Sequence, residues 1–208
     1  MSFIRKRFAV VVFVLLCFVA IGARIWLVNA GYQGVPVTYY SMGEWLSVDD
    51  DYYVDETEPS EGYSFRINSV EVMSPNEYLQ RYGTDGVTSL DTVDADDPCV
   101  VVLDMTIRND SSGQGGVDAF QWQVVPQEQN TSYAMDYELS GHVEKAMSEG
   151  QFSIKPGGEY RTHIAFSGQE DLPYLQDATG QRRPIVTARS FRLALTMRPH
   201  RKVFEFEL

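Results

Sequence analysis

Residues 99–109 read CVVVLDMTIRN, and this stretch decides the fold class. Val101, Leu103, Met105 and Ile107 occupy alternate positions, while polar residues occupy most positions between them. Side chains of a β-strand point to opposite faces in turn, so a period of two predicts a strand with one apolar face. The stretch therefore indicates a half-buried strand of an antiparallel sheet.

The same period recurs along the chain. It is found in YSFRINSVEVM (63–73), FQWQV (120–124), SYAMDYELS (132–140), EYRTHIAF (159–166), SFRLALTM (190–197) and KVFEFEL (202–208). In the first of these stretches the apolar parity changes after Ile67, so we expect a β-bulge near Asn68 and Ser69. The expected helices are short: one over residues 74–83, with Ser74 as N-cap and Pro75 at the first position, and a turn over 172–176. Together these patterns predict an all-β protein, a β-sandwich of seven to nine strands.

The N-terminus predicts a membrane-spanning helix. Arg5, Lys6 and Arg7 precede an uncharged run over residues 8–23, and the apolar character continues past Arg24 to Val28. About 20 residues cross a bilayer as a helix, and a basic flank stays in the cytoplasm, which places the rest of the chain outside. Two alternatives share that location: a signal peptide cut after residue 30, and a lipoprotein anchored at Cys17, which the bulky Leu16 disfavours.

The expected organisation has three parts. Residues 1–30 form a cytoplasmic basic stub and transmembrane anchor (or signal peptide), 31–62 form a linker, first strand and acidic loop, and 63–208 form the remainder of the sandwich. The chain has a net charge of −12, and after residue 30 it holds 13 basic and 29 acidic residues, a net charge of −16. Such a body repels polyanions, so no nucleic-acid partner is expected. Cys99 is the one cysteine of the body, which excludes an internal disulfide there and suggests a buried, unreactive thiol.

Four stretches carry a resemblance to a known family: YSMGEWLSV (40–48), YSFRINSVEV (63–72), VVVLDMTIRNDSS (100–112) and FSIKPGGEYRTHIAF (152–166). The chain from about residue 36 to 208 resembles bacterial membrane-anchored extracellular immunoglobulin-like domains of unknown function. The resemblance implies an immunoglobulin-like antiparallel β-sandwich and an extracellular location, and it implies no catalytic residues. Within such a fold we expect Asn109 to cap a turn, and Gly157 and Gly158 to supply positive φ after Pro156.

Candidate chemical groups are scattered in sequence. The acidic runs over 49–61 and 91–97 are interpreted as solvated loops, with a Ca²⁺ site as the alternative. Asp136 and Glu138 are expected on an outward strand face, and His163 is expected to be exposed. The three histidines have no metal-ligand spacing. The aromatic residues near the first acidic run are expected to pack the first strand onto the sheet, with glycan or protein binding as the alternative; they are Tyr39, Tyr40, Trp45, Tyr52 and Tyr53.

These observations predict an extracytoplasmic, membrane-anchored binding or interaction module of the bacterial cell envelope. We expect no catalysis, and we assign no catalytic, cofactor-binding or metal-binding residues and no cofactor. The expected partners are the membrane, through the N-terminal helix, and an envelope protein or glycan. The alternative is an envelope hydrolase or carbohydrate-active protein that uses surface carboxylates and aromatic residues.

Overall fold

The computed structural model describes residues 2–30, 34–129, 131–168 and 183–208. It contains two compact units, Met1–Val35 and Pro36–Leu208. The first holds helix α1 (Ser2–Ala30), whose segment Val12–Ala30 has a mean hydropathy of 2.2 and is long and apolar enough to cross a membrane. A signal sequence has the same properties. The turn expected over residues 172–176 lies outside the described residues.

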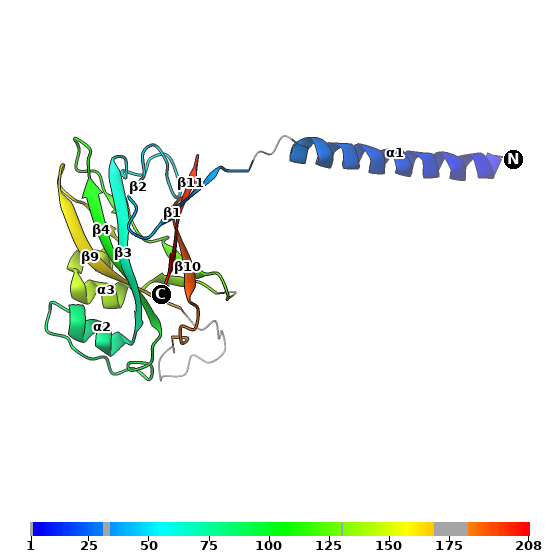
Figure 1. Ribbon diagram of the computed structural model, residues 1–208. Helices are drawn as coiled ribbons and strands as arrows, with labels where there is room; N and C mark the ends of the chain where they lie inside the picture. The colour runs from blue at the N-terminus through cyan, green and yellow to red at the C-terminus, as the bar shows by residue number, and fades with distance from the viewer. Residues whose placement is uncertain (1, 31–33, 130, 169–182) are drawn as a thin grey trace. The chain divides into compact units, whose positions relative to one another are not determined.

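The second unit is built on a nine-stranded sheet (Figure 1). The strand order is β1-β11-β10-β6-β7-β9-β4-β3-β2, and every pairing is antiparallel except β1 with β11. The strands are β1 (Val37–Ser41), β2 (Leu46–Ser47), β3 (Tyr63–Met73), β4 (Val100–Asn109), β6 (Gln123–Pro126), β7 (Tyr133–Met135), β9 (Glu159–Ser167), β10 (Ser190–Thr196) and β11 (Arg201–Glu207). A separate pair joins β5 (Val117–Asp118) to β8 (Gln151–Phe152).

The two halves of the long sheet enclose one apolar core. Strands β3, β4 and β9 lie opposite β10 and β11 in Figure 1, and residues of both halves belong to one cluster of buried side chains. Phe65 of β3 and Leu103 of β4 belong to this cluster together with Phe191 of β10 and Phe204 of β11. The expected all-β sandwich is therefore confirmed.

Strand β4 is buried on both faces, which the alternating pattern did not predict. The face opposite the main core packs against helices α2 (Pro75–Tyr82) and α3 (Tyr137–Val143), through a second cluster that includes Val102, Leu79 and Leu139. Helix α2 begins as expected, because the Ser74 hydroxyl accepts a hydrogen bond from the Glu77 N–H at 3.1 Å. The apolar spacing of β4 marked only the face toward the main core.

The bulge in β3 is confirmed. Ile67 pairs with Met105, but the next pair is Ser69 with Asp104, so Asn68 is the extra residue. An inserted residue shifts the alternation by one position. Val70 and Val72 therefore pack against the same core as Phe65 and Ile67.

Two predicted strands are wrong in part. The strand expected over 132–140 ends at Met135, because the Asp136 carboxylate accepts the Leu139 N–H at 3.1 Å and caps helix α3. The strand expected over 120–124 begins only at Gln123. Asp118 accepts the Phe120 N–H at 3.0 Å, which forms a turn that leaves Phe120 exposed while Trp122 is buried.

Candidate functional site

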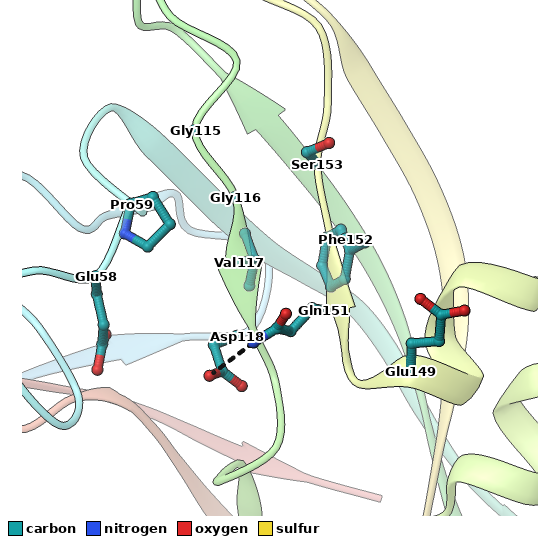
Figure 2. Close-up of a pocket in the computed structure, with 10 residues that line it drawn as sticks. All are labelled: Glu58, Pro59, Gly115, Gly116, Val117, Asp118, Glu149, Gln151, Phe152 and Ser153. Atoms are coloured by element: carbon teal, nitrogen blue, oxygen red, sulfur yellow. Dashed lines mark hydrogen bonds between the residues drawn. The ribbon is translucent and has the colours of Figure 1, made fainter.

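Two adjoining grooves flank the short strand β8. The first has a volume of about 390 Å³ and is lined by Glu58 and Pro59, residues 115–118, Glu149 and residues 151–153 (Figure 2). The second has a volume of about 360 Å³ and is lined by Glu144, Ala146 and Met147, residues 152–155, and residues 158–160. Phe152 and Ser153 line both grooves, so these two residues form the ridge between them.

The first groove is called here the acidic groove, because the described residues that line it include three carboxylates and no basic residue. Glu58 accepts hydrogen bonds from the N–H groups of Tyr53 and Val54, which fixes its loop. Asp118 accepts the Phe120 N–H, and its second oxygen lies 3.5 Å from the Gln151 amide nitrogen. Among the residues that the structure describes, Glu149 and Asp118 form no ion pair. The lining therefore has unneutralised negative charge.

The second groove, called here the apolar groove, exposes more apolar than polar surface, although Glu144, Lys155 and Glu159 also line it. Met147 is buried, and Phe152, Ile154 and Tyr160 pack against the main core. The Tyr160 hydroxyl donates a hydrogen bond to Glu144 at 2.7 Å. Burial and this carboxylate raise the pKa of Tyr160 to about 12, so the phenol stays neutral at physiological pH. The groove suits an apolar group.

Two fully buried side chains hold the loops that form the acidic groove. The Tyr63 hydroxyl donates to the Gln114 carbonyl at 2.6 Å and accepts the Ile154 N–H at 2.9 Å. The Asn109 amide donates to the carbonyls of Gly113, Gln114 and Ile154 at 2.8–3.0 Å. The expected turn cap at Asn109 is confirmed, and the same side chain also links this turn to the segment after β8. The groove is fixed before any ligand binds.

Glycines shape the same wall. Gly115 has φ +53°, and a Cβ on it would lie 2.4 Å from the Pro59 carbonyl oxygen, so no other residue fits. A Cβ on Gly116 would lie 3.5 Å from the nearest atom, which is ordinary contact. Further along, the expected positive φ is confirmed at Gly157 but wrong at Gly158. Gly158 is needed for space, because its Cβ would lie 2.8 Å from the Lys155 carbonyl oxygen.

The first acidic run is not wholly solvated, which corrects the expectation. Asp51 has a side chain only 5% exposed, and both it and Asp49 lie 2.7 Å from the Lys202 ammonium of β11. The Lys202 hydrogen bond lowers the pKa of Asp49. Burial alone would lower the pKa of Lys202, but the bonds to the two carboxylates raise it overall. The base lies about 150 positions along the chain, so the local sequence did not indicate it.

Beside this ion pair lies a third hollow of about 150 Å³. It is lined by residues 49–52 together with Glu56, Glu58 and Glu61. Glu58 also lines the acidic groove, so the two hollows adjoin there. The negative charge around the acidic groove is therefore extended by the loop over 49–61.

The second acidic run and Asp136 also depart from expectation. Asp94 is fully buried, and its carboxylate accepts the Arg183 backbone N–H at 2.6 Å and faces the Arg183 guanidinium at 3.3 Å. Burial alone would raise the pKa of Asp94, but these contacts with Arg183 lower it overall. Asp136, expected on an outward face, is buried and pairs with the Arg183 Nε at 3.0 Å, while Glu138 is exposed. The distant Arg183 gave no local sequence signal.

The histidines lie in three separate places. His142 contacts Asp85, and His200 lies 3.3 Å from Asp51. His163, expected to be exposed, is half-buried and stacked on Tyr82 at 3.8 Å between ring centroids. Within the described ranges, no three or more His, Cys, Asp or Glu side chains are grouped to hold a metal ion. Cys99 is buried as expected, and burial raises its pKa to about 12.

Most of the aromatic residues near the first acidic run pack on the protein. Tyr40 contacts Phe204 edge to face, and the Trp45 ring lies between the guanidinium groups of Arg66 and Arg108, at 4.6 and 4.3 Å. Tyr52 and Tyr53 are half-buried, whereas Tyr39 is 52% exposed. Tyr40 and Tyr53 pack against the main core and Trp45 packs on two arginines of the sheet, so the packing interpretation holds for these three residues. No catalytic, cofactor-binding or metal-binding residue was assigned from sequence, and that assignment stays a prediction.

Comparison with known proteins gives distant similarities. The chain is similar to the yjhA protein from Bacillus subtilis, with 8% identity, a TM-score of 0.39 and coverage of 81% of this chain and 98% of that one. It is also similar to an uncharacterised β-sandwich protein from Clostridium difficile 630, with 12% identity, a TM-score of 0.36 and coverage of 84% and 97%. No curated protein matches the chain. A family model matches residues 37–202, and the chain therefore belongs to the domain of unknown function family DUF5028.

Proposed function

We propose that the protein is a non-catalytic interaction module of the bacterial cell envelope, anchored in the membrane by α1 with its β-sandwich outside the cytoplasm. The anchor is supported by the apolar segment Val12–Ala30 and by the basic residues that precede it. If the segment is instead a cleaved signal peptide, the sandwich still works outside the cytoplasm. The proposal for the sandwich does not depend on which alternative applies.

The single observation that carries the interaction role is the pair of pre-formed grooves beside β8. Their walls are short loops and a two-residue strand, yet Tyr63 and Asn109 hold those loops by buried hydrogen bonds. Buried polar groups that fix a surface hollow are typical of binding sites, because a fixed hollow costs little ordering when a ligand enters. The grooves are therefore the proposed contact surface.

The alternative, a hydrolase that uses surface carboxylates, has weaker support. Asp136 and Glu138 are an example of the paired carboxylates that such an enzyme would need. The Asp136 carboxylate instead contacts Arg183 and accepts hydrogen bonds from the Ser167 hydroxyl at 2.8 Å and from the Leu139 N–H at the start of α3. A carboxylate with these partners has a structural role and is not available to a substrate.

The proposed function can be tested by site-specific photocrosslinking of the full chain in intact cells. A photoreactive residue replaces Gln151 in the acidic groove or, as a matched control, Gln80 on the exposed side of α2. We expect a discrete adduct from position 151 and none from position 80. The adduct should disappear in Gly116→Leu, which fills the groove, and persist in Gly113→Leu, where a Cβ meets open space.

Two results would contradict the proposal. One is the absence of an adduct at position 151 when the protein is at its normal level in the membrane. The other is an adduct that Gly116→Leu leaves unchanged, because filling the groove should block a partner that binds in the groove.

A further inference from the structure

We propose that the two grooves together bind an extended polypeptide segment of a partner protein, with a basic side chain in the acidic groove and an apolar side chain in the apolar groove. This inference rests on the proposed interaction role and adds the chemistry of the ligand.

The acidic groove has the charge that a basic side chain needs. Asp118 and Glu149 are without an ion-pair partner in the described part of the chain, and Lys and Arg are absent from the lining. An ammonium or guanidinium group between such carboxylates gains charge-assisted hydrogen bonds. The adjoining hollow contributes Asp50, Glu56 and Glu61, so the local field also attracts a cationic segment during approach.

The walls of the apolar groove favour a polypeptide over a glycan. Ala146, Met147 and Ile154 contribute aliphatic groups to the lining, which also contains the charged residues Glu144, Lys155 and Glu159. Sugar hydroxyl groups placed on the aliphatic part lose hydrogen bonds to water there. The Tyr160 hydroxyl already donates its one proton to Glu144, so it can act toward a sugar only as an acceptor. An aliphatic or aromatic side chain loses no hydrogen bonds on entering and buries apolar surface.

The ridge between the grooves gives the spacing of the ligand. It consists of Phe152, the last residue of β8, and Ser153, so the ridge is one chain segment wide. In an extended peptide, residues i and i+2 point to the same side and lie about 6.6 Å apart. A peptide that crosses the ridge can therefore place one side chain in each groove when the two residues are separated by a single residue.

The test uses the full chain in detergent micelles and fluorescent hexapeptides measured by anisotropy. The probe Gly-Leu-Gly-Lys-Gly-Gly is compared with the same peptide carrying Glu for Lys, and with one carrying Ser for Leu. We expect saturable binding of the first probe, at least tenfold weaker binding of the other two, and weaker binding as salt rises. The double variant Asp118→Asn with Glu149→Gln should lose at least tenfold for the lysine probe and leave the glutamate probe unchanged or tighter.

A matched control addresses charge alone. Glu138→Gln together with Glu207→Gln removes two exposed carboxylates that do not line either groove, so it should leave binding within about twofold, as expected for screened distant charges. The ligand assignment would be overturned if the unmodified chain bound the glutamate probe as tightly as the lysine probe or more tightly. It would also be overturned if no peptide showed saturable binding. Tighter binding of a chitin tetrasaccharide that the peptides fail to displace would overturn it as well. If those results come with a photocrosslink at position 151 that Gly116→Leu abolishes, the interaction role stands and only the ligand class is wrong.

Discussion

Tyr63 and Ile154 lie 91 positions apart, and the Tyr63 hydroxyl accepts a hydrogen bond from the Ile154 N–H at 2.9 Å. The same hydroxyl donates to the Gln114 carbonyl. One atom at the start of β3 thus joins both loops that bound the acidic groove. The core of the sandwich and the shape of the groove depend on the same side chain.

Tyr63→Phe should therefore lower the stability of the folded protein. It leaves the Ile154 N–H without its partner, whereas the Gln114 carbonyl keeps the Asn109 amide, and an unsatisfied buried polar group costs about 1–3 kcal/mol. Tyr133→Phe is the control, because among the described residues the Tyr133 hydroxyl bonds only to the Gln129 side chain, and its loss should cost less than about 1 kcal/mol. Urea unfolding measures both. Equal effects of the two variants would show that the Tyr63 hydroxyl does not hold the loops.

The two glycines of the groove wall should differ in their response to alanine. Gly115→Ala places a Cβ against the Pro59 carbonyl in a left-handed conformation, which should cost at least about 1–2 kcal/mol. Gly116→Ala meets no close contact and should be nearly neutral for stability while weakening lysine-probe binding. Thermal unfolding and anisotropy separate the two effects. A destabilised Gly116→Ala would mean that the wall is packed differently.

Lys202 should contribute far more to the stability of the folded protein than an exposed basic residue of the same sheet. Lys202→Met leaves the buried Asp51 carboxylate without its cation, and breaking a buried pair on one side costs about 3–5 kcal/mol. Arg192→Met removes the exposed pair with Glu205 and should cost about 0–1 kcal/mol. Denaturant unfolding measures the loss of stability in each variant. Similar losses would contradict the stabilising role of the buried Lys202–Asp51 pair.

The fold should lose stability in acid partly through Asp94. Its pKa is lowered in the folded protein, because the contacts with Arg183 outweigh the effect of burial. A group with a lowered folded pKa contributes stability above its unfolded pKa of about 3.9 and loses that contribution as pH falls through the folded value. Asp94→Asn should therefore be less stable at pH 7 and show a shallower fall in stability below about pH 4. The measurement is the free energy of unfolding of the unmodified chain and of Asp94→Asn as a function of pH. Parallel curves for the two proteins would refute the predicted role of Asp94.

The sequence predicts the strands well where their alternation is local. The β4 stretch, the β3 bulge, the Ser74 cap and the Asn109 turn all leave a signal within a few residues. Asp136 was misassigned because an aspartate fits the polar parity of a strand and also caps a helix, and the choice depends on how α3 packs on β4. The same limit applies to Asp51 and Asp94, whose charges are neutralised by residues far along the chain.

The grooves themselves could not be predicted, because no motif marks them. Phe152 and Ser153 belong to a stretch whose sequence signals are a family resemblance and a Pro-Gly-Gly turn, and neither signal marks a groove. Glu58 and Glu149 are ordinary acids in sequence. They meet because Tyr63 and Asn109 draw together loops that are distant in the chain. A site made from loops becomes visible only when the fold places them side by side.

The most direct test of the account is hydrogen exchange of the full chain in native envelope membranes, compared with the purified chain in micelles. If the grooves are the contact surface, amides of residues 113–118 and 149–154 should exchange more slowly in the native membranes. Amides of the turn over 197–200, between β10 and β11, should exchange equally in both preparations. Equal exchange of the groove segments, or protection confined to another surface, would contradict the account.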